Sequence, residues 1–200
     1  MALVSPSPAR TLHSRRTRQR RRGASLLLAL IAVATASRPA APQSAPPEYE
    51  VKAAFLYNFT KFVEWPPEAL AAGDPVVVAV VGEDPFGRAL ERVFQGKTVQ
   101  EHPVVIRRFE HLDDVQRCHV LFVAAPESGR TAAILKLLGA QPVLTVGDGD
   151  DFVRRGGIIA FGMEGNKVRF QINLDAAERV GLKISSQLAK LATQVVRNPD

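Results

Sequence analysis

The sequence predicts an α/β protein, a three-layer α/β sandwich with a mixed, mostly parallel sheet and a C-terminal β-hairpin plus helices. Two observations predict it. Apolar runs such as residues 76–81 and 120–124, typical of strands covered on both faces, alternate with helical segments. Near the end, two strand-like segments flank the turn at residues 164–166, which is typical of a hairpin and therefore of an antiparallel pair.

The remaining elements follow in order along the chain. A first helix is expected over residues 48–64, before Pro66 and Pro67 end it. Its buried stripe is expected to consist of Val51, Ala54, Phe55, Phe59, Phe62 and Val63. Strands are expected over residues 76–81, 104–109, 120–124, 143–146, 158–162 and 168–173. Helices or helical turns are expected over residues 86–94, 112–117, 126–138, 152–155, 175–180 and 184–195.

Three helix starts have capping signals. Asp84 is expected to cap the helix at residues 86–94, with Pro85 at its first position. A segment resembling a capping box begins at Asp175, and Gly181 stops that short helix. Ser185 and Ser186 are expected to cap the last helix, whose apolar face is formed by Ile184, Leu188, Leu191 and Val195.

The charge distribution argues against nucleic-acid binding. The whole chain has a formal net charge of +6, but eight of its 26 basic residues and none of its 20 acidic residues precede Glu48. The remainder therefore carries a small net negative charge. Binding to phosphate by counterion release needs a surplus of Lys and Arg, which this part lacks.

The basic N-terminal part is typical of a signal peptide. Its arginines lead into an apolar segment at residues 24–36, which is too short to cross a membrane and suits a signal core. We expect a signal peptide over residues 1–36, cleaved after residue 36 or as late as residue 45. The general secretory route is favoured over the twin-arginine route, and a retained short membrane anchor is the alternative.

A linker and a single domain are expected to follow. Residues 37–47 are rich in Ala and Pro and have no apolar period. Residues 48–197 are long enough for one complete core. Cys118 is the only cysteine of the chain, so no internal disulfide forms; it is expected either as a small buried side chain or as a thiol that pairs with another chain.

Sequence motifs for cofactors and metals are incomplete. The turn at residues 82–87 lacks the glycine spacing of a dinucleotide fold and carries two acids, so it is interpreted as a structural turn or a small-ligand crevice. Asp148, Asp150 and Asp151 lack the pattern of a calcium loop and are expected to cap the turn at residue 152. No cofactor and no metal is therefore expected.

Catalytic motifs are incomplete as well. His102, His111 and His119 fall on different expected elements and lack the zinc spacing. Ser128 lacks the first glycine of a nucleophile elbow, and Ser186 with Lys190 has a spacing of four rather than three. The sequence therefore predicts a protein that is not an enzyme.

The first helix is unusually aromatic and apolar around most of its circumference. Such a helix is either buried on several sides or contacts a partner. We keep both interpretations, a central core helix and a contact surface.

Three stretches of the sequence resemble the YfiR family of periplasmic proteins. They are residues 50–66 (EVKAAFLYNFTKFVEWP), residues 118–123 (CHVLFV) and residues 156–188, from GGII through INLDAA to GLKISSQL. The resemblance covers essentially the whole expected domain and implies a non-catalytic regulator. Members of this family bind the periplasmic sensor domain of an inner-membrane diguanylate cyclase and hold it inactive, which restrains cyclic-di-GMP synthesis and biofilm formation.

This resemblance gives the contact surface a partner. Tyr57, Lys61 and Trp65 are expected to be exposed and to bind the sensor domain of the cyclase or a second copy of the chain. The competing function is that of a periplasmic small-molecule binding or sensor protein, with a crevice near residues 82–87 and 124–128.

Overall fold

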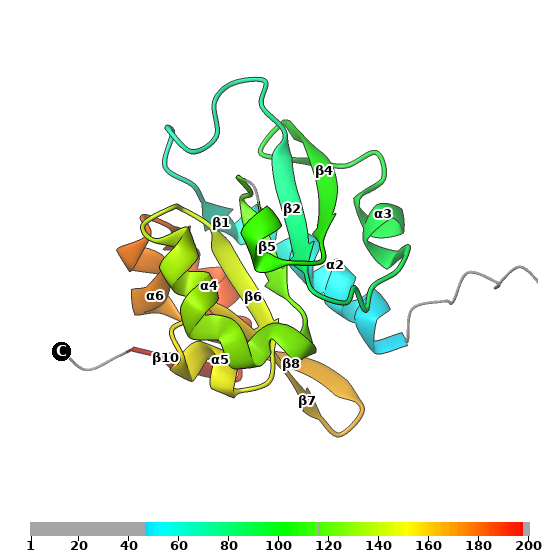
Figure 1. Cartoon of the computed structure of the whole chain (residues 1–200), viewed down its shortest axis with the longest axis vertical. Helices are drawn as coiled ribbons and strands as arrows, with labels where there is room; N and C mark the ends of the chain where they lie inside the picture. Colours follow the sequence, from blue (N-terminus) through cyan, green and yellow to red (C-terminus); the bar gives the residue numbers. More distant parts are fainter. Residues whose placement is uncertain (1–46, 116, 198–200) are drawn as a thin grey trace, which may run out of the picture. The chain divides into compact units, whose positions relative to one another are not determined.

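The computed structural model describes residues 47–115 and 117–197 (Figure 1). The expected signal peptide, its cleavage sites and all but the last residue of the expected linker lie outside the described residues. Within the described part, no helix combines the length and apolar character needed to cross a membrane.

The described part of the chain contains a mixed sheet in the strand order β10-β8-β7-β6-β5-β2-β4-β3. Five of its strands run parallel to one another; they are β4 (His102–Phe109), β2 (Val76–Val81), β5 (Val120–Val123), β6 (Leu144–Asp148) and β7 (Ile159–Glu164). β8 (Lys167–Asn173) pairs antiparallel with β7 and forms the expected hairpin. The mixed, mostly parallel sheet is therefore confirmed.

Helices cover both faces of this sheet. α2 (Pro47–Phe62) and α3 (Ala89–Phe94) pack on one face, as do α6 (Leu174–Arg179) and α7 (Ser186–Leu191). The opposite face packs against η1 (Leu112–Asp114), α4 (Thr131–Leu138) and α5 (Asp151–Arg154), and η2 (Ala125–Arg130) precedes α4. In Figure 1, α4 and α5 lie in front of the sheet and α2 behind it. The three-layer arrangement is confirmed.

Side-chain alternation along β2 explains why the chain needs two helical layers. Val76, Val78 and Val80 belong to the core under α2, whereas Val77, Ala79 and Val81 belong to the core under α4 and α5. Successive side chains of a strand point to opposite faces. An apolar residue at every position therefore requires cover on both sides.

Four short strands were not expected from the sequence. β1 (Val63–Glu64) pairs antiparallel with β9 (Lys183–Ile184), and β3 (Thr98–Val99) pairs with the start of β4. β10 (Gln194–Val196) pairs in parallel with β8.

The expected last helix is wrong beyond Leu191. Thr193 turns the chain back to the sheet, because its backbone N–H and its hydroxyl both donate to the carbonyl of Phe170, at 2.9 and 3.0 Å. Val195, expected on the helix face, lies in β10 instead, and a β-branched run of this kind favours a strand. The expected cap is confirmed, since Ser185 Oγ accepts from the N–H of Gln187.

Three helix starts also differ from expectation. Asp84 accepts a hydrogen bond from the N–H of Phe86 at 2.8 Å, but the helix α3 begins only at Ala89. The expected helix at residues 126–138 is divided into the 3₁₀ segment η2 and α4. Asn173, not Asp175, caps α6, because its side chain accepts from the N–H of Ala176.

The buried face of α2 is rotated from the expected stripe. Leu56 is fully buried, whereas Val51 is 46% exposed and Ala54 is exposed. Phe59 and Val63 are buried as expected. The reason is Lys52, which is only 3% exposed and lies in the middle of the buried face. A hydrophobicity pattern assigns such a residue to solvent, and the stripe rotates with that assignment.

Lys52 is held by two acidic residues, Asp148 at the carboxyl end of β6 and Glu48 on α2. Its Nζ lies 2.7 Å from Oδ1 of Asp148 and also pairs with the carboxylate of Glu48, one turn earlier on α2. The hydroxyl of Tyr49 donates to the other oxygen of Asp148 at 2.9 Å, and Lys52 Nζ lies 4.4 Å from the centre of the Tyr49 ring. Burial, and then the neighbouring Asp148, raise the pKa of Tyr49, so it stays a neutral donor.

We predict that Lys52→Met destabilises the protein by about 3–5 kcal/mol, because it leaves Asp148 without its buried counter-charge. The double variant Lys52→Met/Asp148→Asn should recover part of this loss, because the more buried of the two carboxylates that pair with Lys52 is then replaced by a neutral amide. Chemical denaturation of the domain measures both effects.

The matched control is Arg92→Ala, which removes the exposed ion pair between Arg92 of α3 and Glu50 of α2. This change should cost less than about 1 kcal/mol. Equal losses for the buried and the exposed pair would contradict the prediction.

Candidate partner-binding surface

The outward part of α2 centres on Tyr57. Its half-buried ring packs edge-on against Phe94 of α3, with 5.4 Å between ring centres. The Nζ atoms of Lys97 and Lys61 lie 4.4 and 5.5 Å from the centre of the Tyr57 ring. An aromatic ring flanked by two ammonium groups favours contact with an acidic partner surface.

The exposure expected for Tyr57, Lys61 and Trp65 is confirmed for only part of the set. Lys61 is exposed and Tyr57 is half-buried, and the cation–π contact places the two together. The expected exposure of Trp65 is wrong, because this side chain is only 8% exposed and belongs to the core. Trp65 packs edge-on against His119, with 6.4 Å between ring centres.

Trp65 points into the core because the two residues before it, which form β1, pair with β9. Val63 and Glu64 pair with Ile184 and Lys183, and the carbonyl of Phe62 accepts from the N–H of Ser185 at 2.9 Å. The chain therefore leaves α2 as a strand, which redirects its side chains. The indole nitrogen of Trp65 has no hydrogen-bond partner among the described residues.

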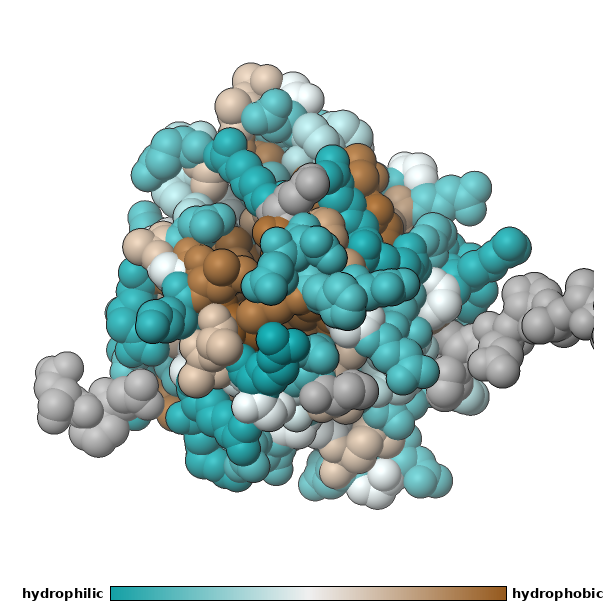
Figure 2. Space-filling model, in the orientation of Figure 1, coloured by the Kyte–Doolittle hydropathy of each residue, from teal (hydrophilic) through white to brown (hydrophobic). Residues whose placement is uncertain are grey.

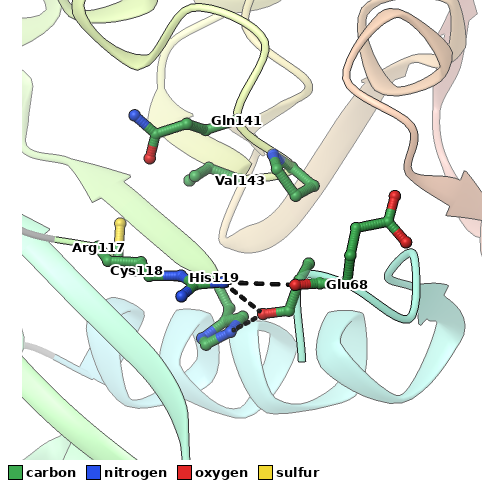
Figure 3. A pocket seen from close by; sticks show the side chains of 8 residues that line it. Glu68, Arg117, Cys118, His119, Gln141 and Val143 are labelled. Carbon is green, nitrogen blue, oxygen red and sulfur yellow. Dashed lines mark hydrogen bonds between the residues drawn. The ribbon is translucent and has the colours of Figure 1, made fainter. Parts of the chain in front are cut away.

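His119 connects this region to the sheet in a defined tautomer. Its Nδ1 accepts from the N–H of Val77 at 2.9 Å, so Nε2 carries the proton and donates to the carbonyl of Ala69 at 3.0 Å. Figure 3 shows the same carbonyl receiving a bond from Arg117, at 3.4 Å. Burial lowers the pKa of His119, and the neutral ring fits both bonds.

A hollow of about 360 Å³ lies beside His119, at the amino ends of β5 and β6. Glu68, Arg117, Gln141 and Val143 line it (Figure 3). Cys118 also lines it but is buried, as expected, and burial raises the pKa of its thiol to about 12. The thiol is therefore protonated at neutral pH and a poor nucleophile.

A second hollow, of about 340 Å³, lies at the carboxyl end of β6 and is lined by charged residues that include Asp150, Asp151 and Arg155. The expected capping role of the three aspartates is wrong. Asp150 occupies the cap position of α5 without a side-chain hydrogen bond, Asp151 pairs with Arg154, and Asp148 pairs with Lys52. Within residues 47–115 and 117–197, no group of three potential ligands is arranged to hold a metal ion.

The acids in the turn at residues 82–87 have a structural explanation. Asp84 accepts from Arg108 of β4 at 2.6 Å, and the same guanidinium reaches Glu91 and the carbonyl of Gly87. The hydrogen bond from Arg108 helps to lower the pKa of Glu91 against the opposing effect of burial. This network fixes the turn against β4, and the hollow near it includes Ser128 but not the turn itself.

The face over α4 and α5 carries a second apolar area. Figure 2 shows apolar side chains gathered near α4 and bordered by hydrophilic ones. Leu137 of α4 is 50% exposed. This face lies on the other side of the sheet from Tyr57 and provides a control position for tests of the α2 surface.

The sequence alone did not reveal the ion pair between Lys52 and Asp148, which sets the rotation of α2 and so the side chains that α2 exposes. Lys52 stands between Val51 and Ala53, and Asp148 follows a buried strand, so neither residue is unusual by itself. A usable signal was a lysine with apolar residues on both sides of it, because a charge that is buried at such a position needs an acidic partner.

The described residues define a class of protein: a three-layer α/β domain with an aromatic ring, Tyr57, flanked by two lysines at the surface of its first helix. Residues 49–193 match the YfiR/HmsC-like family, and the chain belongs to that family. The resemblance seen in the sequence is therefore confirmed.

Two solved structures are similar to this chain, and the first of them supports the fold. A conserved domain protein from Vibrio cholerae O1 biovar El Tor is similar with a TM-score of 0.52 at 14% identity, over 77% of this chain and 62% of that one. This chain thus spans less than two thirds of that protein. An ABC domain from Streptococcus pneumoniae, solved in complex with L-Trp, has a TM-score of 0.46 at 10% identity, over 60% of this chain and 55% of that one.

We predict that acid destabilises the domain partly through His119. Its folded pKa lies below the ordinary value of 6.5, chiefly because of burial; Arg117 and His102 lower it further, while the hydrogen bond to the Ala69 carbonyl and the charge of Asp74 oppose this shift. The unfolded state therefore binds the proton first, so the stability from the neutral ring is complete above about pH 6.5 and declines below it. Thermal melting between pH 7.5 and pH 5 measures this decline.

His119→Gln is the matched variant, because its side-chain amide offers an acceptor and a donor but does not titrate. Its melting temperature should fall less on acidification than that of the wild type. An equal fall in both proteins would show that other groups cause the acid sensitivity.

Proposed function

We propose that this protein is a non-catalytic periplasmic regulator that binds the sensor domain of an inner-membrane diguanylate cyclase and restrains cyclic-di-GMP synthesis and biofilm formation. The observation that carries the proposal is membership of the YfiR/HmsC-like family over residues 49–193. The N-terminal arginine and apolar segments support export by a cleavable signal peptide.

The α2 surface is the proposed contact. Tyr57 and Lys61 would contact the partner directly, while Trp65 would support the surface from beneath through its packing against His119. A half-buried tyrosine suits an interface anchor, because its ring contributes contact area at low entropic cost and its hydroxyl tolerates water. A second copy of the chain is the other protein that this surface would accept, and nucleic acid is not a partner.

The test is retention of the cyclase from solubilised membranes by the tagged domain. We predict that Tyr57→Ala weakens retention by about 2 kcal/mol, roughly 30-fold, and that Lys61→Glu weakens it through like charge. Leu137→Ala, on the opposite face, should leave retention unchanged.

Trp65→Ala is expected to lower stability by about 3–5 kcal/mol, because it removes a core side chain, and so it does not report on direct contact. Retention that is unchanged by both surface variants, with intact melting curves, would remove the α2 surface from the proposal. Failure of the wild-type domain to retain any cyclase would overturn the proposed partner.

The second candidate function is that of a small-molecule sensor. The two hollows of about 360 and 340 Å³ favour it, because they are of the size that small ligands occupy. A ligand at 100 times its dissociation constant should add about 2.7 kcal/mol of stability. A thermal-shift screen of small polar metabolites without any shift would count against this function.

A further inference from the structure

The outer edge of β4 is open along most of its length. β3 pairs with β4 only through Val99 with His102 and Thr98 with Pro103. Beyond this point, no strand of the described part pairs with the outer edge of β4, which continues to Phe109. The inner edge of the same strand is fully paired with β2 over Val76–Val81.

The direction of the backbone groups on this edge follows from two pairings. The carbonyl of Phe109 accepts from the N–H of Gly82, which follows β2, so residue 109 points inward. Backbone groups alternate in direction along a strand. Val104, Ile106 and Arg108 therefore direct their N–H and C=O groups outward, as does His102, which pairs with Val99 of β3.

We propose that this edge binds an extended segment of a partner protein, which pairs with β4 as an additional strand. Donor and acceptor groups recur outward at every second residue, about 6.6 Å apart. Only another extended backbone matches such a row of groups over this length, which is the basis of recognition by strand addition.

The edge is rigid before any partner binds. Arg108 bonds to Asp84, Glu91 and the carbonyl of Gly87, which fixes the far end of β4 to the helical layer. The side chains of Val104 and Ile106 pack against the core under α2 and α3. Because this edge is already ordered, binding a partner costs little conformational entropy on this side of the interface.

The exposed side chains of β4 indicate the sequence of the partner segment. Val105 is 38% exposed and Arg107 is exposed on the same face of the sheet. A segment with an apolar residue beside Val105 and an acidic residue beside Arg107 complements them, since opposite charges stabilise cross-strand pairs. An antiparallel second copy centred on Ile106 would make the two Arg107 side chains diagonal neighbours, which favours a different protein as the occupant.

The inference rests on the proposed function for the identity of the partner, the diguanylate cyclase. Val104→Pro tests it. Proline removes the outward N–H at this position but no bond to β2, and it is tolerated in edge strands when its nitrogen faces away from the paired strand. Val104→Ala is the matched control, because it trims the side chain and keeps the N–H.

The experiment measures retention of the cyclase from solubilised membranes by each tagged variant. We expect Val104→Pro to weaken retention at least tenfold relative to Val104→Ala, and Arg107→Glu to weaken it as well. Equal retention by Val104→Pro and Val104→Ala overturns the edge as the binding site while the proposed function stands. Loss of retention by the wild type overturns both.

If Val104→Pro folds poorly, hydrogen exchange on the wild-type protein tests the same proposal without a substitution. The amides of Val104, Ile106 and Arg108 should exchange at least tenfold more slowly in the complex with the cyclase than in the free protein. Unchanged exchange at all three amides in a complex that forms would overturn the proposal.

Discussion

The rest of the structure depends on the ion pair that Lys52 makes with Asp148 beneath α2. Apolar contacts alone would allow the helix several rotations on the sheet, because the hydrophobic effect is not directional. A buried ammonium group removes this freedom, since it is stable only beside its carboxylates. Lys61 lies nine residues further, or two and a half turns, and therefore points to solvent when Lys52 points to the core. The pair thus decides which side chains α2 offers to a partner.

This dependence explains what the sequence could and could not predict. The long strands were predictable because runs such as Val76–Val81 are apolar at every position, and the hairpin because a turn separates two strand-like segments. The rotation of α2 could not be predicted from the helix alone. It depends on Asp148, which lies 96 positions from Lys52 in the sequence, and no local pattern connects the two residues. A periodicity analysis treats every lysine as a surface residue, and here the one exception rotated the whole stripe.

The short strands were unpredictable for a different reason. β1, β3 and β9 have two residues each, which is a single period of strand alternation and too short to form a repeating pattern. They exist because a partner strand lies beside them, as β9 does for β1. The error for Trp65 follows directly: the helical pattern was extended through residue 64, whereas the chain had already become a strand that turns Trp65 toward His119. Tertiary pairing overrides local propensity most easily at the ends of helices.

The charge distribution connects the two proposed contact regions. The part of the chain from Glu48 onward carries a slight excess of acidic residues, yet Lys61 and Lys97 flank Tyr57, and Arg107 lies on the exposed face of β4. Basic groups on a near-neutral protein are too few to attract nucleic acid, but they select among protein partners by electrostatic complementarity. Both regions therefore favour the same kind of partner, an acidic surface with an extended segment at its margin. Such recognition needs no catalytic group, and a domain with two rigid contact regions is suited to restraining another protein.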